Sequence, residues 1–283
     1  MKNRYKLLEF PGYFGDRSGL IVLDFLLYVG SGAFVGLVVG LTGVGGGSLM
    51  TPMLIMFGIP YNVAIGTDLL YAAITKASGV VAHTRQKSIQ WRLVAYLAAG
   101  SIPASLITSQ LLYHVFTDAE EYREILTTSL GIMLIFTAAV ILLKRFLRNA
   151  SDRPHGPIGA FFQLHATKVT FVAGIFLGIF VTLSSVGAGA FCAALLMVLY
   201  PRLPALHVVG TDIAHAVPLT LIAGLGHLFL LGNVDLILLG SLLIGSLPAI
   251  HLGTRLAARL PSQVLQPILA CLLLGMGIKF ALF

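Results

Sequence analysis

The sequence predicts an all-α polytopic membrane protein made of two homologous repeats of five segments each. Of its 283 residues, 57% are hydrophobic and only 10% are charged, and the mean hydropathy is +0.94. Nearly every stretch of twenty residues between the loops is therefore apolar enough to cross a bilayer. The net charge of +7 comes from basic residues in loops and tails, where they orient helices in the membrane, so nucleic-acid binding is not indicated.

The duplication is visible as a glycine-rich break that occurs twice in the chain. Gly43-Val44-Gly45-Gly46-Gly47 interrupts one apolar run, and Ser185-Val186-Gly187-Ala188-Gly189 interrupts another in the second half. A break of this kind frees backbone N–H groups that lipid cannot satisfy, so it survives only where protein or water supplies partners. Matching breaks in two halves are typical of a transporter site. Three further matches are Gly66-Thr67-Asp68 with Gly210-Thr211-Asp212, His83 with His227, and Gly100–Ala104 with Gly245–Ala249.

Each repeat is predicted to contain a long helix, the break, a half-length helix and three more helices. An eleven-residue helix rises ~16 Å, about half of the ~30 Å hydrocarbon core, so the short segments are half-helices. The expected helices are 20–42, 48–58, 63–84, 93–113 and 124–146 in the first repeat, and 166–185, 190–200, 206–230, 236–256 and 263–282 in the second. The corresponding divisions are a tail at 1–19, the first repeat at 20–148, a cytoplasmic linker at 149–164 and the second repeat at 165–283.

Lysine and arginine in the short loops predict the topology. The loops at 85–92 and 255–262 and the linker are rich in these residues and are expected in the cytoplasm, whereas the loops at 114–123 and 231–235 are expected outside. The equivalent loops 85–92 and 231–235 then lie on opposite sides, which requires an inverted repeat. The basic N-terminal tail, which this topology places outside, conflicts with it. A parallel repeat with re-entrant half-helices is the alternative.

Two long motifs resemble the sulfite exporter TauE/SafE family, also described as the toluene sulfonate uptake permease family. They are Gly40-Leu41-Thr42-Gly43-Val44-Gly45-Gly46-Gly47-Ser48-Leu49-Met50-Thr51-Pro52 and the run from Ala64 to Lys76, and the run from Val209 to Thr220 is similar to the family's second repeat. The resemblance implies a multi-pass transporter of the inner (plasma) membrane. Its substrate would be a small sulfur-containing anion such as sulfite, thiosulfate, sulfoacetate or another organosulfonate. The second break keeps only Gly187-Ala188-Gly189, so unequal contributions from the two halves are expected.

The breaks suit a small anion without reference to any family. Glycines remove side chains just before each half-helix, so that free N–H groups and the positive helix end face whatever occupies the break. Glycines that only allow close helix packing are the alternative, which the duplication disfavours. The candidate substrate-binding residues are Thr42, Gly45, Gly46, Gly47, Ser48, Lys76, Ser184, Ser185, Gly187 and Gly189.

Ionisable residues within the spans should have partners, because each costs about 2.5–3.5 kcal/mol at mid-membrane. Lys76 is expected to attract the anion and Asp68 to carry a proton or cation. The alternative for Asp68 and Asp212 is capping of the helices that follow Gly66-Thr67 and Gly210-Thr211. Histidines near these positions could relay protons or be structural. The candidate coupling or polar intramembrane residues are Thr67, Asp68, His83, Thr211, Asp212, His215 and His227.

These features predict a secondary transporter that is coupled to protons or another ion and works by alternating access. The alternative is an anion-selective channel with a glycine-lined filter. No spacing typical of an enzyme, metal site or cofactor site is present, and the expected partners are the anion, lipid and protons; a homo-oligomer is compatible with the sequence. Cys192 and Cys271 lie in apolar segments and are expected to be buried free thiols.

Overall fold

The structure is a computed structural model that describes residues 18–42, 47–116, 121–151, 164–187, 189–257 and 262–282. These parts of the chain are helical, with short connections, and contain no strand. The helices are α1 (Ser18–Thr42), α2 (Gly47–Met56), α3 (Tyr61–Arg85), α4 (Trp91–Val115), α5 (Arg123–Ser151), α7 (Ala166–Ser184), α8 (Ala190–Leu199), α9 (Ala205–Gly226), the π-helix η1 (His227–Leu231), α10 (Leu236–Ala257) and α11 (Ser262–Leu282).

The expected all-helical membrane fold is confirmed. Among the described residues, five helices are long and apolar enough to cross a membrane: α4, α5 up to Leu143, α7, α9 together with η1, and α10 up to Leu256. The 25-residue α3 does not reach this apolarity, because it carries Asp68, Lys76 and several other polar side chains. The chain is therefore a multi-pass membrane protein whose least apolar long helix lies in the first half.

The two half-length helices occur where they were expected. Both α2 and α8 have 10 residues, which gives each a length of about 15 Å. α5 continues through Ser151, three residues into the predicted linker at 149–164. The helix continues past Arg148 and Asn149, because arginine and the following Ala150 both favour helical backbone.

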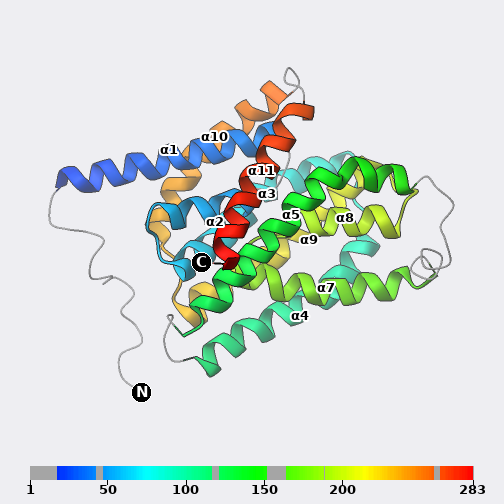
Figure 1. Cartoon of the computed structure of the whole chain (residues 1–283), viewed down its shortest axis with the longest axis horizontal. Helices are drawn as coiled ribbons and strands as arrows, with labels where there is room; N and C mark the ends of the chain where they lie inside the picture. The colour runs from blue at the N-terminus through cyan, green and yellow to red at the C-terminus, as the bar shows by residue number, and fades with distance from the viewer. Residues whose placement is uncertain are drawn as a thin grey trace.

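Pairs of helices form the edges of the molecule (Figure 1). α1 lies along α10 at one edge and α4 lies along α7 at the other, while α3 packs on α9 and α5 on α11 between them. Glycines make the edge pairs close: a Cβ atom on Gly36 would meet the carbonyl oxygen of Ser246, and one on Gly178 would meet that of Ser101. Small residues at such intervals allow close helix packing in membranes.

Matching contacts relate the two halves. The backbone N–H of Asp235 donates to Thr67 Oγ1 at 3.1 Å, and the N–H of Gln90 donates to Thr211 Oγ1 at 3.0 Å. Each threonine precedes the aspartate of its Gly-Thr-Asp motif, and each donor precedes the helix that follows. The contacts of α1 with α10 and of α7 with α4 match in the same way, as a two-fold relation between the repeats would require. Inversion of the repeats relative to the membrane stays a prediction.

The cysteines differ from expectation in one respect. Cys192 is fully buried in α8, but Cys271 is exposed on α11. Its neighbours Ile268 and Leu272 are also exposed, so this thiol lies on an apolar outer surface of the kind that lipid covers. Expecting both thiols to be buried was therefore wrong, because an apolar helix in a membrane protein need not face protein on every side.

Candidate functional site

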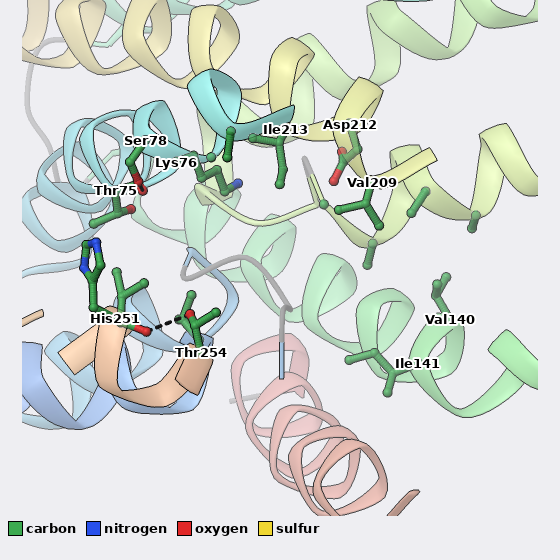
Figure 2. A pocket seen from close by; sticks show the side chains of 18 of the residues that line it. Thr75, Lys76, Ser78, Val140, Ile141, Val209, Asp212, Ile213, His251 and Thr254 are labelled. Atoms are coloured by element: carbon green, nitrogen blue, oxygen red, sulfur yellow. Dashed lines mark hydrogen bonds between the residues drawn. The ribbon is translucent and has the colours of Figure 1, made fainter. Parts of the chain in front are cut away.

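Lys76 and Asp212 lie on the wall of a cavity of about 550 Å³. Figure 2 shows the two side chains extending from neighbouring helices into the same space, with His251 and Thr254 of α10 and Val140 and Ile141 of α5 on other walls. Small residues of α8, including Ala193 and Ala194, complete the lining. The cavity therefore collects residues from both halves of the chain.

The cavity reaches deep into the protein. It extends from Ala82 and Arg255, near the ends of α3 and α10, to Lys76 and Asp212. Lys76 is nine residues before the end of α3, a helical rise of about 13 Å, so it lies well inside the helix and away from the loop 85–92. This end of the molecule carries the loop 85–92, which is predicted to be cytoplasmic.

Electrostatic partners of Lys76 come from two helices. Asp212 of α9 interacts with it most strongly, and Asp68, on the same helix as Lys76, interacts next. Asp68 and Lys76 are eight residues apart, which spaces them by about 12 Å along α3, so the facing carboxylate of α9 is the nearer partner. Packing of α3 on α9 brings these charges together.

The last residue of the second break, Gly189, lies on the cavity wall. Gly189 and Ala190 line the cavity at the start of α8, so the positive end of that helix dipole faces the space. Gly187 has φ +107°, and a Cβ atom there would collide with Met133. The positive φ favours glycine here, whereas the end of the flexible Met133 side chain could move aside. Ser185, at φ +58°, also turns in the left-handed region.

Asp68 lies outside the cavity and is completely buried. The hydroxyl of Thr51 in α2 donates to its Oδ2 at 2.5 Å. Its Oδ1 has no hydrogen-bond partner among the described residues, although Ser185 lies beside it without a hydrogen bond of ordinary geometry. The first-half carboxylate thus contacts both half-helix regions, α2 and the start of the second break.

The capping alternative for the two aspartates is wrong. α3 begins after Pro60 and α9 after Pro204, so Asp68 and Asp212 lie two turns inside their helices. Proline presets the first-turn backbone angle and needs no N–H partner there, which explains why the helices start earlier than the Gly-Thr-Asp motifs. Asp212 is only 8% exposed and lies beside the Cys192 thiol.

The three candidate histidines do not line the cavity. His215 Nε2 lies 2.8 Å from Ser101 Oγ, His227 Nε2 lies 3.0 Å from the carbonyl oxygen of Thr182, and His83 Nδ1 lies 2.8 Å from Ser88 Oγ. His215 and His227 are fully buried. Each bridges two segments of the fold, and Thr67 and Thr211 do so too through their bonds to loop N–H groups.

Part of the first break lies outside the described residues, so the structure does not place Gly45 and Gly46. Thr42 ends α1 and Gly47 begins α2, and Ser48 is buried. Ser184 donates to the carbonyl oxygen of Phe180 at 2.6 Å, as a helix-end hydroxyl does. Of the predicted substrate-binding residues, the cavity brings together Lys76 and Gly189.

Sequence reasoning missed several residues of the site. Thr51 of α2 donates a hydrogen bond to Asp68. Cys192 of α8 lies beside Asp212. His251 and Thr254 come from α10. Their position one turn apart near a basic loop gave no sign of a cavity, because that depends on how α10 packs against α3.

Comparison with known proteins agrees with this architecture. Residues 28–280 match the family described as sulfite exporter TauE/SafE. The chain is 40% identical over 253 residues to a probable membrane transporter protein, YjnA, of Bacillus subtilis, covering 88% of this chain and 96% of that protein.

Two other relatives bear similar names. A second probable membrane transporter protein of Bacillus subtilis, YdhB, is 27% identical and is matched over 82% of this chain and 90% of its own. A probable membrane transporter protein of Methanocaldococcus jannaschii is also 27% identical, over 92% and 95% of the two chains. No solved structure matches the chain. This multi-pass plasma-membrane protein therefore belongs to the sulfite exporter TauE/SafE family of membrane transporters.

Proposed function

We propose that the chain is a secondary transporter that moves a small sulfur-containing anion across the plasma membrane by proton-coupled alternating access. Sulfite, thiosulfate, sulfoacetate or another organosulfonate is the substrate class. The observation that carries this proposal is the position of Lys76 on a deep cavity that the start of α8 also lines.

Lys76 and the start of α8 both favour an anion. A buried ammonium attracts an anion more strongly than the same charge does in water, because the local dielectric constant is lower. Gly189 has no side chain, so an oxyanion can approach the backbone at the positive end of the helix. Much of the remaining wall is apolar and includes Ala190, Ala193 and Val209, while Thr75, Ser78 and Thr254 add hydroxyl groups.

The nearby carboxylates explain why anion binding would be coupled to protons. Asp212 is the strongest electrostatic partner of Lys76, so an arriving anion must compete with it. With Asp68 and Asp212 both ionised, the two negative charges that act on Lys76 exceed its own positive charge, while the second cation of the cavity wall, Arg255, lies near the end of α10. Uptake of a proton by Asp212 frees Lys76 and makes the site neutral or positive toward the anion.

Closed packing beyond the cavity supports alternating access over a channel. On the opposite side of the molecule, Asn62 Nδ2 donates to Asn233 Oδ1 at 2.7 Å, and Asn233 Nδ2 donates to the hydroxyl of Tyr122 at 2.8 Å. Asn233 is 4% exposed. An open channel would need a continuous path, whereas a transporter exposes its site to one side at a time.

The test is anion flux in proteoliposomes with sulfite, thiosulfate and sulfoacetate, with and without a pH gradient. We expect saturable flux that the pH gradient drives for at least one of these anions. Lys76→Met should weaken binding of that anion about tenfold to a hundredfold, the range for removing a charged hydrogen-bond partner. Lys168→Met, which removes an exposed lysine of α7, is the matched control and should keep normal flux.

Two results would contradict the proposal. Conductance that neither saturates nor responds to the pH gradient would favour the channel. Unchanged affinity in a well-folded Lys76→Met protein would place the anion site elsewhere.

A further inference from the structure

Two residues of the cavity wall, Ala82 and Thr254, have counterparts in the other half of the chain. Aligning Thr67-Asp68 with Thr211-Asp212 pairs Ala82 of α3 with Gly226 of α9. Aligning Gly100–Ala104 with Gly245–Ala249 pairs Thr254 of α10 with Ser109 of α4. The matched hydrogen bonds of Thr67 and Thr211 support the first of these alignments.

The counterparts Ser109 and Gly226 are packed together instead of lining a cavity. Thr254 and Ala82 are exposed on the cavity wall, whereas Ser109 is 1% exposed and Gly226 is buried. A Cβ atom on Gly226 would lie 2.7 Å from Ser109 Oγ. Accordingly, α4 contacts α9 more extensively than α10 contacts α3.

This closed region is nevertheless lined with hydroxyl groups. Thr182 of α7 donates to Ser105 Oγ of α4 at 2.7 Å, and both residues are fully buried. Ser109 Oγ, one turn further along α4, has no hydrogen-bond partner among the described residues. An unpartnered buried hydroxyl is unfavourable in a permanent core but is expected in a wall that water reaches in another conformation.

The hydroxyls continue from the centre of the protein toward its far side. Ser185, one turn after Thr182, lies beside Asp68, and both Ser185 Oγ and Asp68 Oδ1 lack hydrogen-bond partners in the described part of the chain. From the centre, the row of hydroxyls leads along α4 past Ser109 to the end of that helix at Val115. The loop 114–123 lies at that end, on the side opposite to the loop 85–92 near the cavity.

We infer that Ser105, Ser109 and Thr182 line the second half of the transport path, closed in this conformation, which opens to the opposite side when the Lys76 cavity closes. The inference rests on the proposed transport of a small hydrated anion. Hydroxyl groups suit such an ion, since they replace its water without adding a charge that would hold it. Opening requires α9 to separate from α4 at Gly226, so that the path takes the form now seen between α3 and α10.

Cysteine labelling tests the inference in a protein that lacks native cysteines (Cys192→Ala, Cys271→Ala). Ser109→Cys is nearly isosteric and probes the closed path, and Thr254→Cys is the equivalent position on the open cavity. Ile107→Cys is the matched control for a position facing lipid, because Ile107 is 66% exposed on the outer face of α4. The reagent is a membrane-impermeant cationic methanethiosulfonate, applied from either side of sealed vesicles.

Without substrate, Thr254→Cys should react from the side of the loop 85–92 and Ser109→Cys should be protected. Sulfoacetate, which unlike sulfite does not react with the reagent, should together with a pH gradient raise the labelling rate of Ser109→Cys from the opposite side at least tenfold and slow that of Thr254→Cys. Ile107→Cys should react slowly throughout. Ser105→Cys repeats the measurement should Ser109→Cys fold poorly.

The outcomes separate this inference from the proposed function. If the protein transports an anion but neither Ser109→Cys nor Ser105→Cys ever reacts faster than Ile107→Cys, the path is wrong and the transport proposal stands. If no anion is transported but Gly226→Val alone exposes Ser109→Cys from the opposite side, the path stands and the transport proposal fails.

Discussion

Where α3 packs on α9, α10 lies against α3 on one flank and α4 lies against α9 on the other. These two flanks differ more than the two edges of the molecule do. At the edges, α1 lies on α10 and α7 lies on α4 with glycine at corresponding contacts. At the crossing, α3 and α10 enclose a cavity, while α9 and α4 close around Ser109 and Gly226. The repeats are thus alike where they are held together and unlike where a substrate would pass.

A second difference concerns charge. Lys76 corresponds to Thr220 in the second repeat, and Thr220 is fully buried with its hydroxyl donating to the carbonyl oxygen of Ala216. The open flank therefore carries a cation, and the closed flank carries hydroxyl groups. The two copies share the scaffold, whereas the group proposed to bind the anion is present in the first copy alone.

The largest expected effect comes from the edges. Gly36→Val and Gly178→Val each place a side chain against a carbonyl oxygen of the neighbouring helix, and each should destabilise the fold by about 3 kcal/mol. The measurement is thermal stability in detergent. Gly240→Ala, where a Cβ atom meets nothing within 4 Å, is the control, and a clear difference between the two valine variants would break the likeness of the edges.

A smaller effect is expected at the crossing, where the flanks should respond differently. Gly226→Val fills the closed side beside Ser109 and should disfavour the described conformation by about 1–3 kcal/mol. Ala82→Val, the equivalent change on the cavity wall, should be accommodated. The labelling rate of Thr254→Cys measures the shift. Equal rates in the two variants would show that the flanks do not alternate.

The smallest effect should again be equal in the two halves. Thr67→Val and Thr211→Val each remove the acceptor of one part-buried loop N–H group and should cost about 1 kcal/mol. Unfolding midpoints of the two variants, compared with wild type, measure this. Destabilisation by only one substitution would mean that the matched hydrogen bonds are not equivalent in energy.

The sequence was sufficient to predict ten helical segments, two of them half-helices, because apolar runs and glycine breaks are local signals. It also predicted that Lys76 and Asp212 matter, since charges are rare within spans. It could not predict that Asp212 rather than Asp68 lies on the cavity. Both aspartates follow the same Gly-Thr motif, and their difference arises from how α10 and α4 pack.

The close glycine contacts within the edge pairs α1–α10 and α7–α4 also have a mechanical consequence. Where the backbone of one helix lies directly on the next, as Gly36 lies on Ser246 and Gly178 on Ser101, no flexible side chain separates them to absorb a displacement. Each edge pair should therefore behave as a stiff strut. Strain from any rearrangement then concentrates at the crossing of α3 and α9, and a small tilt there is amplified along the struts into a large displacement at the membrane surfaces.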